Sequence, residues 1–205
     1  VGLDTLVQQH GMADTINSLR HMGLPAFSRD QAMKMVETLA NSRSIQLEAT
    51  HAAVMLDAIQ WLQPYWIQRA FGQVRILLKT EPGSDMGALV LRAVHLLAEP
   101  GNDNELHHWL SRLTQQLGQI DAGHAVAMLN KAAATPEGAR ASLLLAIMEA
   151  RLPDATKEQA KMSFIALRDI LQRDAYWTPS GEGDTRHYKF MLEPLRRWWL
   201  RRDTL

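Results

Sequence analysis

The stretch "SRDQAMKMVETLA", residues 28–40, sets the architecture that we expect for the whole chain. Ser28, followed by Gln31 three residues later, has the spacing of a capping box, which begins a helix. The apolar residues after it, among them Val36 and Ala40, recur at steps of three and four residues. That period places them on one face of an amphipathic helix. The stretch therefore predicts a helix that buries one side against neighbouring helices.

The same pattern recurs along most of the chain. β-branched residues are sparse, few segments alternate apolar and polar residues, and helix start and stop signals agree with the period. We predict helices at residues 3–22, 28–40, 44–63, 65–79, 85–98, 104–117, 122–134, 135–151, 156–173 and 186–202. The fold class is thus predicted as all-α, with about nine to ten helices.

Short turns separate these helices, which suits antiparallel neighbours. The alanine-rich residues 124–155 suit stacked helix hairpins as well. We therefore predict a multi-helix bundle or a short α-solenoid-like array, formed by residues 1–205 as one all-helical domain. The turns at 80–84 and 99–104 are the places where that domain would divide. Because the first residue is Val1 and not methionine, we expect the chain to be a fragment of a larger protein.

Composition restricts the possible functions. Acidic and basic residues balance at 22 each, which argues against a dedicated nucleic-acid-binding domain, because such domains are usually basic. The chain has no cysteine, so disulfides, thiolate zinc sites and cysteine nucleophiles are excluded. No apolar run approaches the roughly 20 residues that span a bilayer. The usual catalytic signatures, such as a phosphate-binding glycine loop, are missing too.

Two Glu-x-x-His pairs, Glu48/His51 and Glu105/His108, are the strongest metal-ligating pattern. Residues three apart on a helix share a face, and two such pairs with two further glutamates build the di-iron site of ferritin-like bundles. Glu37 is a candidate third contributor, and no fourth is found. Local hydrogen bonding of surface or half-buried histidines is the interpretation that we favour, so no metal or other cofactor is expected.

Aromatic residues gather around Pro64, where Trp61, Tyr65 and Trp66 lie close in sequence. One interpretation is that these rings fill the core at a helix corner. The other is an exposed groove for a partner, because aromatic residues are enriched at interface hot spots.

The closing stretch "EPLRRWWLRRDTL", residues 193–205, combines cations and rings. Three interpretations stay open. The rings pack on the domain while the arginines cap a helix end; or rings and arginines lie at a bilayer surface; or the arginines hold phosphates and the rings stack on bases. The residues concerned are Arg196, Arg197, Trp198, Trp199, Arg201 and Arg202.

The sequence as a whole favours a non-enzymatic helical scaffold or adaptor that binds a protein partner through the two aromatic and basic stretches. We expect a cytoplasmic protein that also touches the inner face of a membrane near its C-terminus, as part of a membrane-associated assembly such as a bacterial secretion or conjugation apparatus. The first alternative is a metal-dependent, di-iron-like helical-bundle enzyme. The second is nucleic-acid binding through the C-terminal Arg/Trp cluster. The neutral total charge argues against nucleic acid as the partner.

Overall fold

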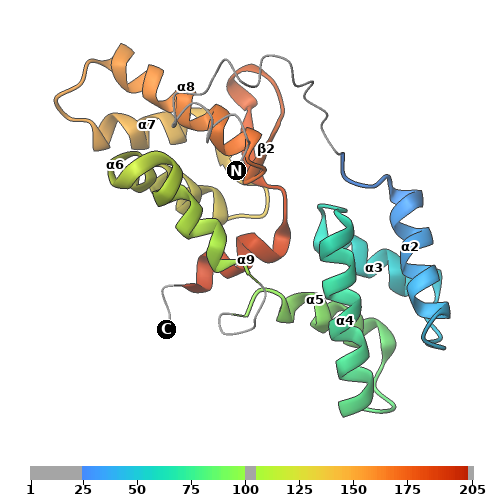
Figure 1. Ribbon diagram of the computed structural model, residues 1–205. Coiled ribbons are helices and arrows are strands. Elements are labelled where there is room, and N and C mark those ends of the chain that lie inside the picture. Colours follow the sequence, from blue (N-terminus) through green and yellow to red (C-terminus); the bar gives the residue numbers. More distant parts are fainter. Residues whose placement is uncertain (1–24, 100–104, 203–205) are drawn as a thin grey trace, which may run out of the picture. The chain divides into compact units, whose positions relative to one another are not determined.

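The computed structural model describes residues 25–99 and 105–202, and this part of the chain is predominantly helical (Figure 1). It contains eight α-helices and one small three-stranded antiparallel sheet. The prediction of a mainly helical chain is therefore confirmed, while the sheet was not foreseen. The helix predicted at 3–22 lies outside the described residues.

The chain divides into two compact units. The first, called here the helical unit, includes residues 25–99 and 191–202. Its described elements are α2 (Arg29–Asn41), α3 (Ala49–Ile59), α4 (Pro64–Thr80), α5 (Met86–Leu96) and α9 (Glu193–Arg201). The second, called the sheet unit, includes Glu105–Phe190. Its elements are α6 (His107–Ala133), β1 (Ala139–Arg140), α7 (Ala141–Arg151), α8 (Lys157–Arg173), β2 (Trp177–Ser180), a 3₁₀ turn (Gly183–Thr185) and β3 (His187–Phe190). The predicted single domain, with division near 80–84 or 99–104, stays a prediction.

Helix α2 begins as its sequence predicts. The Ser28 hydroxyl accepts from the backbone N–H of Gln31, and the Gln31 side chain accepts from the backbone N–H of Ser28. These bonds satisfy two of the donors that a helix start leaves open. Val36 and Ala40 are buried, so the apolar face turns inward. In the helical unit α2, α3 and α4 pack side by side (Figure 1).

Helix α4 begins at Pro64, which confirms the prediction of a separate helix after this proline. Proline is tolerated in the first turn because that position needs no N–H donor. One face of α4 is buried in the core of the helical unit, which leaves the opposite face for the surface. The buried residues are Trp66, Ile67, Ala70, Phe71, Val74 and Leu77.

The prediction that Thr135 starts a helix is wrong. The Thr135 hydroxyl instead donates to the carbonyl of Gly138 at 2.8 Å, which closes a turn. Gly138 has φ +81°, and a Cβ there would lie 2.1 Å from the carbonyl oxygen of Tyr188. Glycine is required because strand β3 approaches so closely. Strand β1 follows, and α7 begins only at Ala141.

The prediction of one helix over 186–202 is also wrong in its first half. Residues His187–Phe190 form the central strand β3, which pairs with β1 on one side and β2 on the other. Tyr188 and Phe190 are buried, whereas His187 and Lys189 are half-buried, so the strand alternates over only four residues. Pro179 is accommodated because β2 lies at the sheet edge, where an absent N–H is tolerated.

The described residues contain eight α-helices, slightly fewer than the nine to ten predicted for the whole chain. Two helices were expected at 104–117 and 122–134, and they run end to end as α6 with a break in the helical backbone at Gly118. Gly118 adopts φ 73° and ψ 169°, a conformation that glycine reaches without strain. A one-residue kink thus replaces the expected loop. The solenoid-like alternative stays a prediction.

Candidate protein-interaction surface

The predicted Arg/Trp cluster lies on α9, and its rings point into the core. Trp198 is 6% exposed and Trp199 is 1% exposed, with ring centroids 6.0 Å apart in an edge-to-face arrangement. Arg196 is only 8% exposed, whereas Leu200 is 49% exposed. Most of this stretch therefore stabilises the fold, as the first interpretation of the sequence expects.

Glu193 holds the buried end of α9 together. Its carboxylate accepts two hydrogen bonds from Arg196, each 2.7 Å long, and one from Arg197 of 2.9 Å. Burial opposes ionisation of this carboxyl group, but the hydrogen bonds and charges of Arg196 and Arg197 outweigh it and lower the pKa of Glu193. The group is ionised at neutral pH, and it compensates a guanidinium that would otherwise be buried unpaired.

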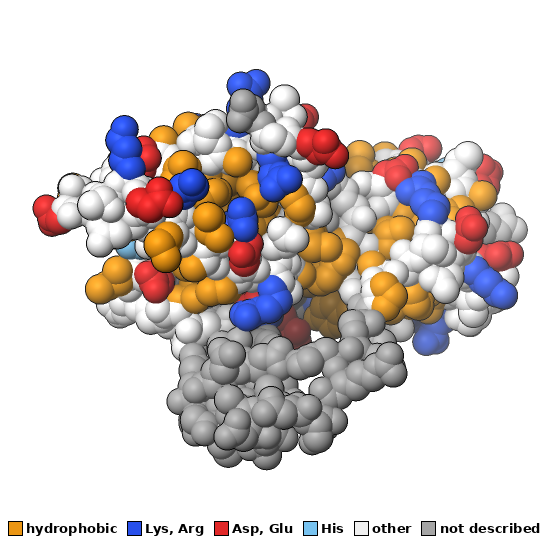
Figure 2. All heavy atoms as spheres, turned by 90° about the horizontal axis from the view of Figure 1, so that it is seen from above, with side chains coloured by type: hydrophobic (Ala, Val, Ile, Leu, Met, Phe, Trp, Pro, Cys, Tyr) orange, Lys and Arg blue, Asp and Glu red, His pale blue; other side chains and the backbone are white. Residues whose placement is uncertain are grey.

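The remaining cations of α9 also have partners within the helical unit. Arg201 forms an ion pair with Glu99, and the Arg202 guanidinium lies 4.5 Å from the centroid of the Trp199 ring. Burial, followed by the positive charges of Arg197 and Arg201, lowers the pKa of His95 nearby. On the face seen in Figure 2, Lys and Arg side chains stand among hydrophobic and acidic ones. The carboxylates of Glu193 and Glu99 already pair with Arg196, Arg197 and Arg201 of α9.

The aromatic residues around Pro64 divide between core and surface. Trp66 is 5% exposed and Trp61 is half-buried, whereas Tyr65 is 40% exposed. The Tyr65 and Trp66 rings meet edge to face, with centroids 4.9 Å apart. Tyr65 is therefore the predicted aromatic residue that offers the most surface to a partner.

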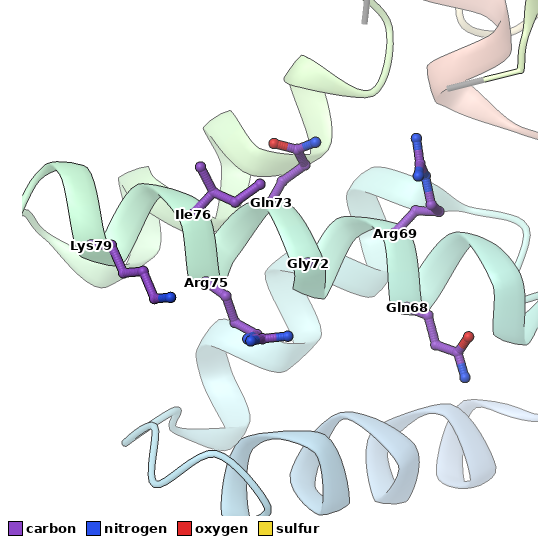
Figure 3. Close-up of a pocket in the computed structure, with 7 residues that line it drawn as sticks. All are labelled: Gln68, Arg69, Gly72, Gln73, Arg75, Ile76 and Lys79. Carbon is purple, nitrogen blue, oxygen red and sulfur yellow. The ribbon is translucent and has the colours of Figure 1, made fainter. Parts of the chain in front are cut away.

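Beyond Tyr65, the outer face of α4 carries a shallow groove of about 380 Å³ (Figure 3). Gln68, Arg75 and Lys79 point to the side of α4 along which α2 runs, whereas Gln73 and Ile76 point to the other side. None of the described residues that line the groove is acidic. They are Gln68, Arg69, Gly72, Gln73, Arg75, Ile76 and Lys79.

A second, mainly apolar groove of about 520 Å³ runs between α2 and α4. Gln68 lines both grooves, so the two adjoin at this residue. We call their combined lining the α2–α4 surface. The second groove is lined by Phe27, Gln31, Lys34, Met35, Thr38, Leu39, Pro64 and Gln68. A basic groove joined to an apolar one can hold a ligand that has both acidic and apolar sides.

The structure does not bring the two Glu-x-x-His pairs into one site. Glu48 and His51 belong to the helical unit, whereas Glu105 and His108 belong to the sheet unit. Glu48 only precedes α3, where its carboxylate accepts from the Thr50 hydroxyl at 3.3 Å. The third candidate, Glu37, is exposed on α2. Across residues 25–99 and 105–202, no three histidine or acidic residues are grouped so that they could hold a metal ion.

Sequence reasoning missed the α2–α4 surface almost entirely. For residues 28–40, the prediction concerned the face that carries Val36 and Ala40, and the cations of residues 65–79 drew no comment. The available signal was the spacing of Gln68, Gly72, Arg75 and Lys79, which puts small and polar residues on one side of α4.

Comparisons of the chain with protein-family models, with curated proteins and with solved structures found no match. Among the helices in the described part of the chain, none combines the length and the apolarity that crossing a membrane requires. Function is therefore argued from the surface itself.

Proposed function

We propose that the chain is a non-enzymatic helical adaptor that binds a protein partner on its α2–α4 surface. One observation carries the proposal: an apolar groove between two helices adjoins, at Gln68, a groove lined by three cations. Grooves between helices are a recurring way to bind the apolar face of a partner segment.

The apolar groove has side chains that suit such a contact. Phe27, Met35, Leu39 and Pro64 are each half-buried, so part of each side chain is still in water. Covering apolar surface releases about 25 cal/mol per Å². Methionine adds a flexible, polarizable side chain that adapts to different partners. Tyr65, one residue after Pro64, extends the accessible aromatic area along α4.

The proposal is tested by photo-crosslinking from the groove. A photoreactive phenylalanine analogue replaces Met35, the chain is exposed to light in an extract of its own cells, and the crosslinked protein is identified. That protein is then purified, and its affinity is measured for the unmodified chain and for Met35→Glu. We expect the substitution to weaken binding at least tenfold, because it puts a charge into the apolar groove.

Leu91→Glu is the matched control. Leu91 is 39% exposed on α5 and lines neither groove, so the same type of change there should leave the affinity within about twofold. Circular dichroism checks that both variants fold. Equal affinities of the unmodified chain and Met35→Glu would place the interface elsewhere and refute this assignment.

A further inference from the structure

Gly72, on the exposed side of α4, is a residue for which the chain itself shows no need. A glycine inside a helix costs about 1 kcal/mol relative to alanine. A Cβ built at Gly72 has no neighbour within 4 Å among the described residues beyond its own helix. The other internal helix glycines differ. Gly118 has the positive φ of the α6 kink, a Cβ built at Gly87 would lie 3.4 Å from an oxygen of Asp85, and one at Gly123 would lie 3.3 Å from the Arg151 side chain.

The missing side chain leaves a notch on the helix surface. Gly72 lies at the centre of the groove in Figure 3, with Gln68 one turn before it and Ile76 one turn after it. Where a side chain is missing, the backbone of a second molecule can come closer than the usual distance between helices, which is about 8–10 Å. The notch therefore fits a close backbone contact from outside the chain.

The rim of the notch is positively charged. Arg69, Arg75 and Lys79 line the groove, and no carboxylate does so within the described part. Neither Arg75 nor Lys79 has an ion pair with any other described residue. A ligand that supplies carboxylates would complement these charges, and one that supplies cations would be repelled.

Two exposed apolar residues mark the ends of this face. Tyr65 is 40% exposed and Ile76 is 54% exposed. They are eleven positions apart on α4, which corresponds to about 16 Å along the helix axis. Three turns of a second α-helix cover that length and present side chains every three or four residues to one face.

From the notch, the charges and the length we infer the chemistry of the partner, and this inference rests on the proposed function. The α2–α4 surface receives an acidic amphipathic α-helix of another protein. The backbone of that helix packs at Gly72, and its carboxylates pair with Arg75 and Lys79. Its apolar residues enter the groove lined by Phe27, Met35 and Leu39.

The test is an unbiased selection with a display library of single-helix peptides whose surface positions are randomised. The chain is the target, and Gly72→Leu is the counter-target. We expect the peptides that bind the chain, but not the variant, to carry Asp and Glu on one helix face. Affinities of the selected peptides should fall at least tenfold with Gly72→Leu and with the pair Arg75→Glu/Lys79→Glu. They should also weaken as salt rises from about 0.05 to about 0.5 M, because salt screens surface charges.

Two controls separate binding from folding and from general charge. Leucine has a better helix propensity than glycine, and the site is open, so Gly72→Leu should melt no lower than the unmodified chain. Lys157→Glu/Lys161→Glu makes the same charge change at exposed positions of α8, in the other unit, and should leave the affinities within about twofold.

Several outcomes would overturn the inference. Selected peptides that are neutral or basic, peptides that bind Gly72→Leu as well as the unmodified chain, or the absence of any enriched peptide each contradict it. If single-stranded DNA displaces the peptides while buffer without DNA does not, the cations would be assigned to phosphate instead. Self-association seen by sedimentation and removed by Gly72→Leu would assign the surface to a second copy.

Failure of the inference and failure of the proposed function give different results. If the crosslinked partner depends on Met35 while the selected peptides are not acidic, the adaptor function stands and the partner chemistry is wrong. If acidic peptides bind at Gly72 but no cellular protein depends on Met35, the surface chemistry stands and the adaptor proposal fails.

Discussion

Glu193→Gln should destabilise the helical unit more than any ordinary surface change. Glu193 is 7% exposed and receives three hydrogen bonds from Arg196 and Arg197. The substitution removes its charge and leaves the buried Arg196 guanidinium uncompensated. Breaking a buried pair in this way costs about 3–5 kcal/mol. Since whole domains are stable by only about 5–15 kcal/mol, the loss is a large share of the total.

The assay is urea unfolding followed by circular dichroism, with hydrogen exchange to locate the loss in α9. Glu99→Gln is the matched control, because it breaks the ion pair between Glu99 and Arg201. Both side chains of that pair are exposed, Glu99 by 47% and Arg201 by 44%. Such exposed pairs contribute about 0–1 kcal/mol. A second comparison is Glu193→Leu/Arg196→Met, which replaces both charges by apolar groups and should lose less than Glu193→Gln.

The reasoning depends on burial as the cause of the difference. If Glu193→Gln and Glu99→Gln lower the free energy of unfolding equally, the Glu193 carboxylate is not the buried compensating charge described here. If the double substitution is as damaging as the single one, the guanidinium is not left uncompensated in Glu193→Gln.

Three further predictions concern the folded chain. Because the pKa of Glu193 is lowered, the folded state holds the proton of this carboxyl group less tightly than the unfolded state does. The resulting stabilisation is present above the ordinary pKa of 4.5 and is lost as the pH falls through the lowered pKa. Unfolding midpoints should therefore drop on acidification, and they should drop less in Glu193→Gln. Gly138→Ala should cost at least about 3 kcal/mol, because its Cβ meets the Tyr188 carbonyl, whereas Gly83→Ala, with φ +87° and open space, should cost about 1 kcal/mol in the same thermal melts. Tyr176→Phe removes the 2.6 Å hydrogen bond from the buried hydroxyl to the Trp109 carbonyl and should cost about 1–3 kcal/mol. The control Tyr65→Phe, at an exposed position, should cost less than about 0.5 kcal/mol. Equal melting temperatures for the two variants would contradict this prediction.

The sequence predicted a helix correctly where its start depends only on residues a few positions apart. The capping box at Ser28 and the proline start at Pro64 place α2 and α4 correctly, because these effects involve neighbouring backbone groups only. The same kind of reasoning failed at Thr135 and at residues 187–190. There the chain forms a sheet whose hydrogen bonds join residues about 50 positions apart, such as Ala139 and Tyr188.

The candidate site was predictable only in part. Tyr65 was singled out for its aromatic ring, and the structure leaves it exposed; Trp66, next to it, is buried. Nothing local distinguishes the two rings, since adjacent helix residues differ in direction by about 100° and only the neighbouring helices define the inner side.

By itself, the sequence determined that most of this chain is helical and where several helices begin, because period and capping are properties of short stretches. On α4 and α9, only the tertiary structure decided which aromatic and charged side chains meet water. On α9 it buries Trp198, Trp199 and the Glu193–Arg196 pair, and on α4 it leaves Gly72 open beside Arg75 and Lys79. The physical reason is that exposure depends on what packs against a helix, and those neighbours come from distant parts of the chain.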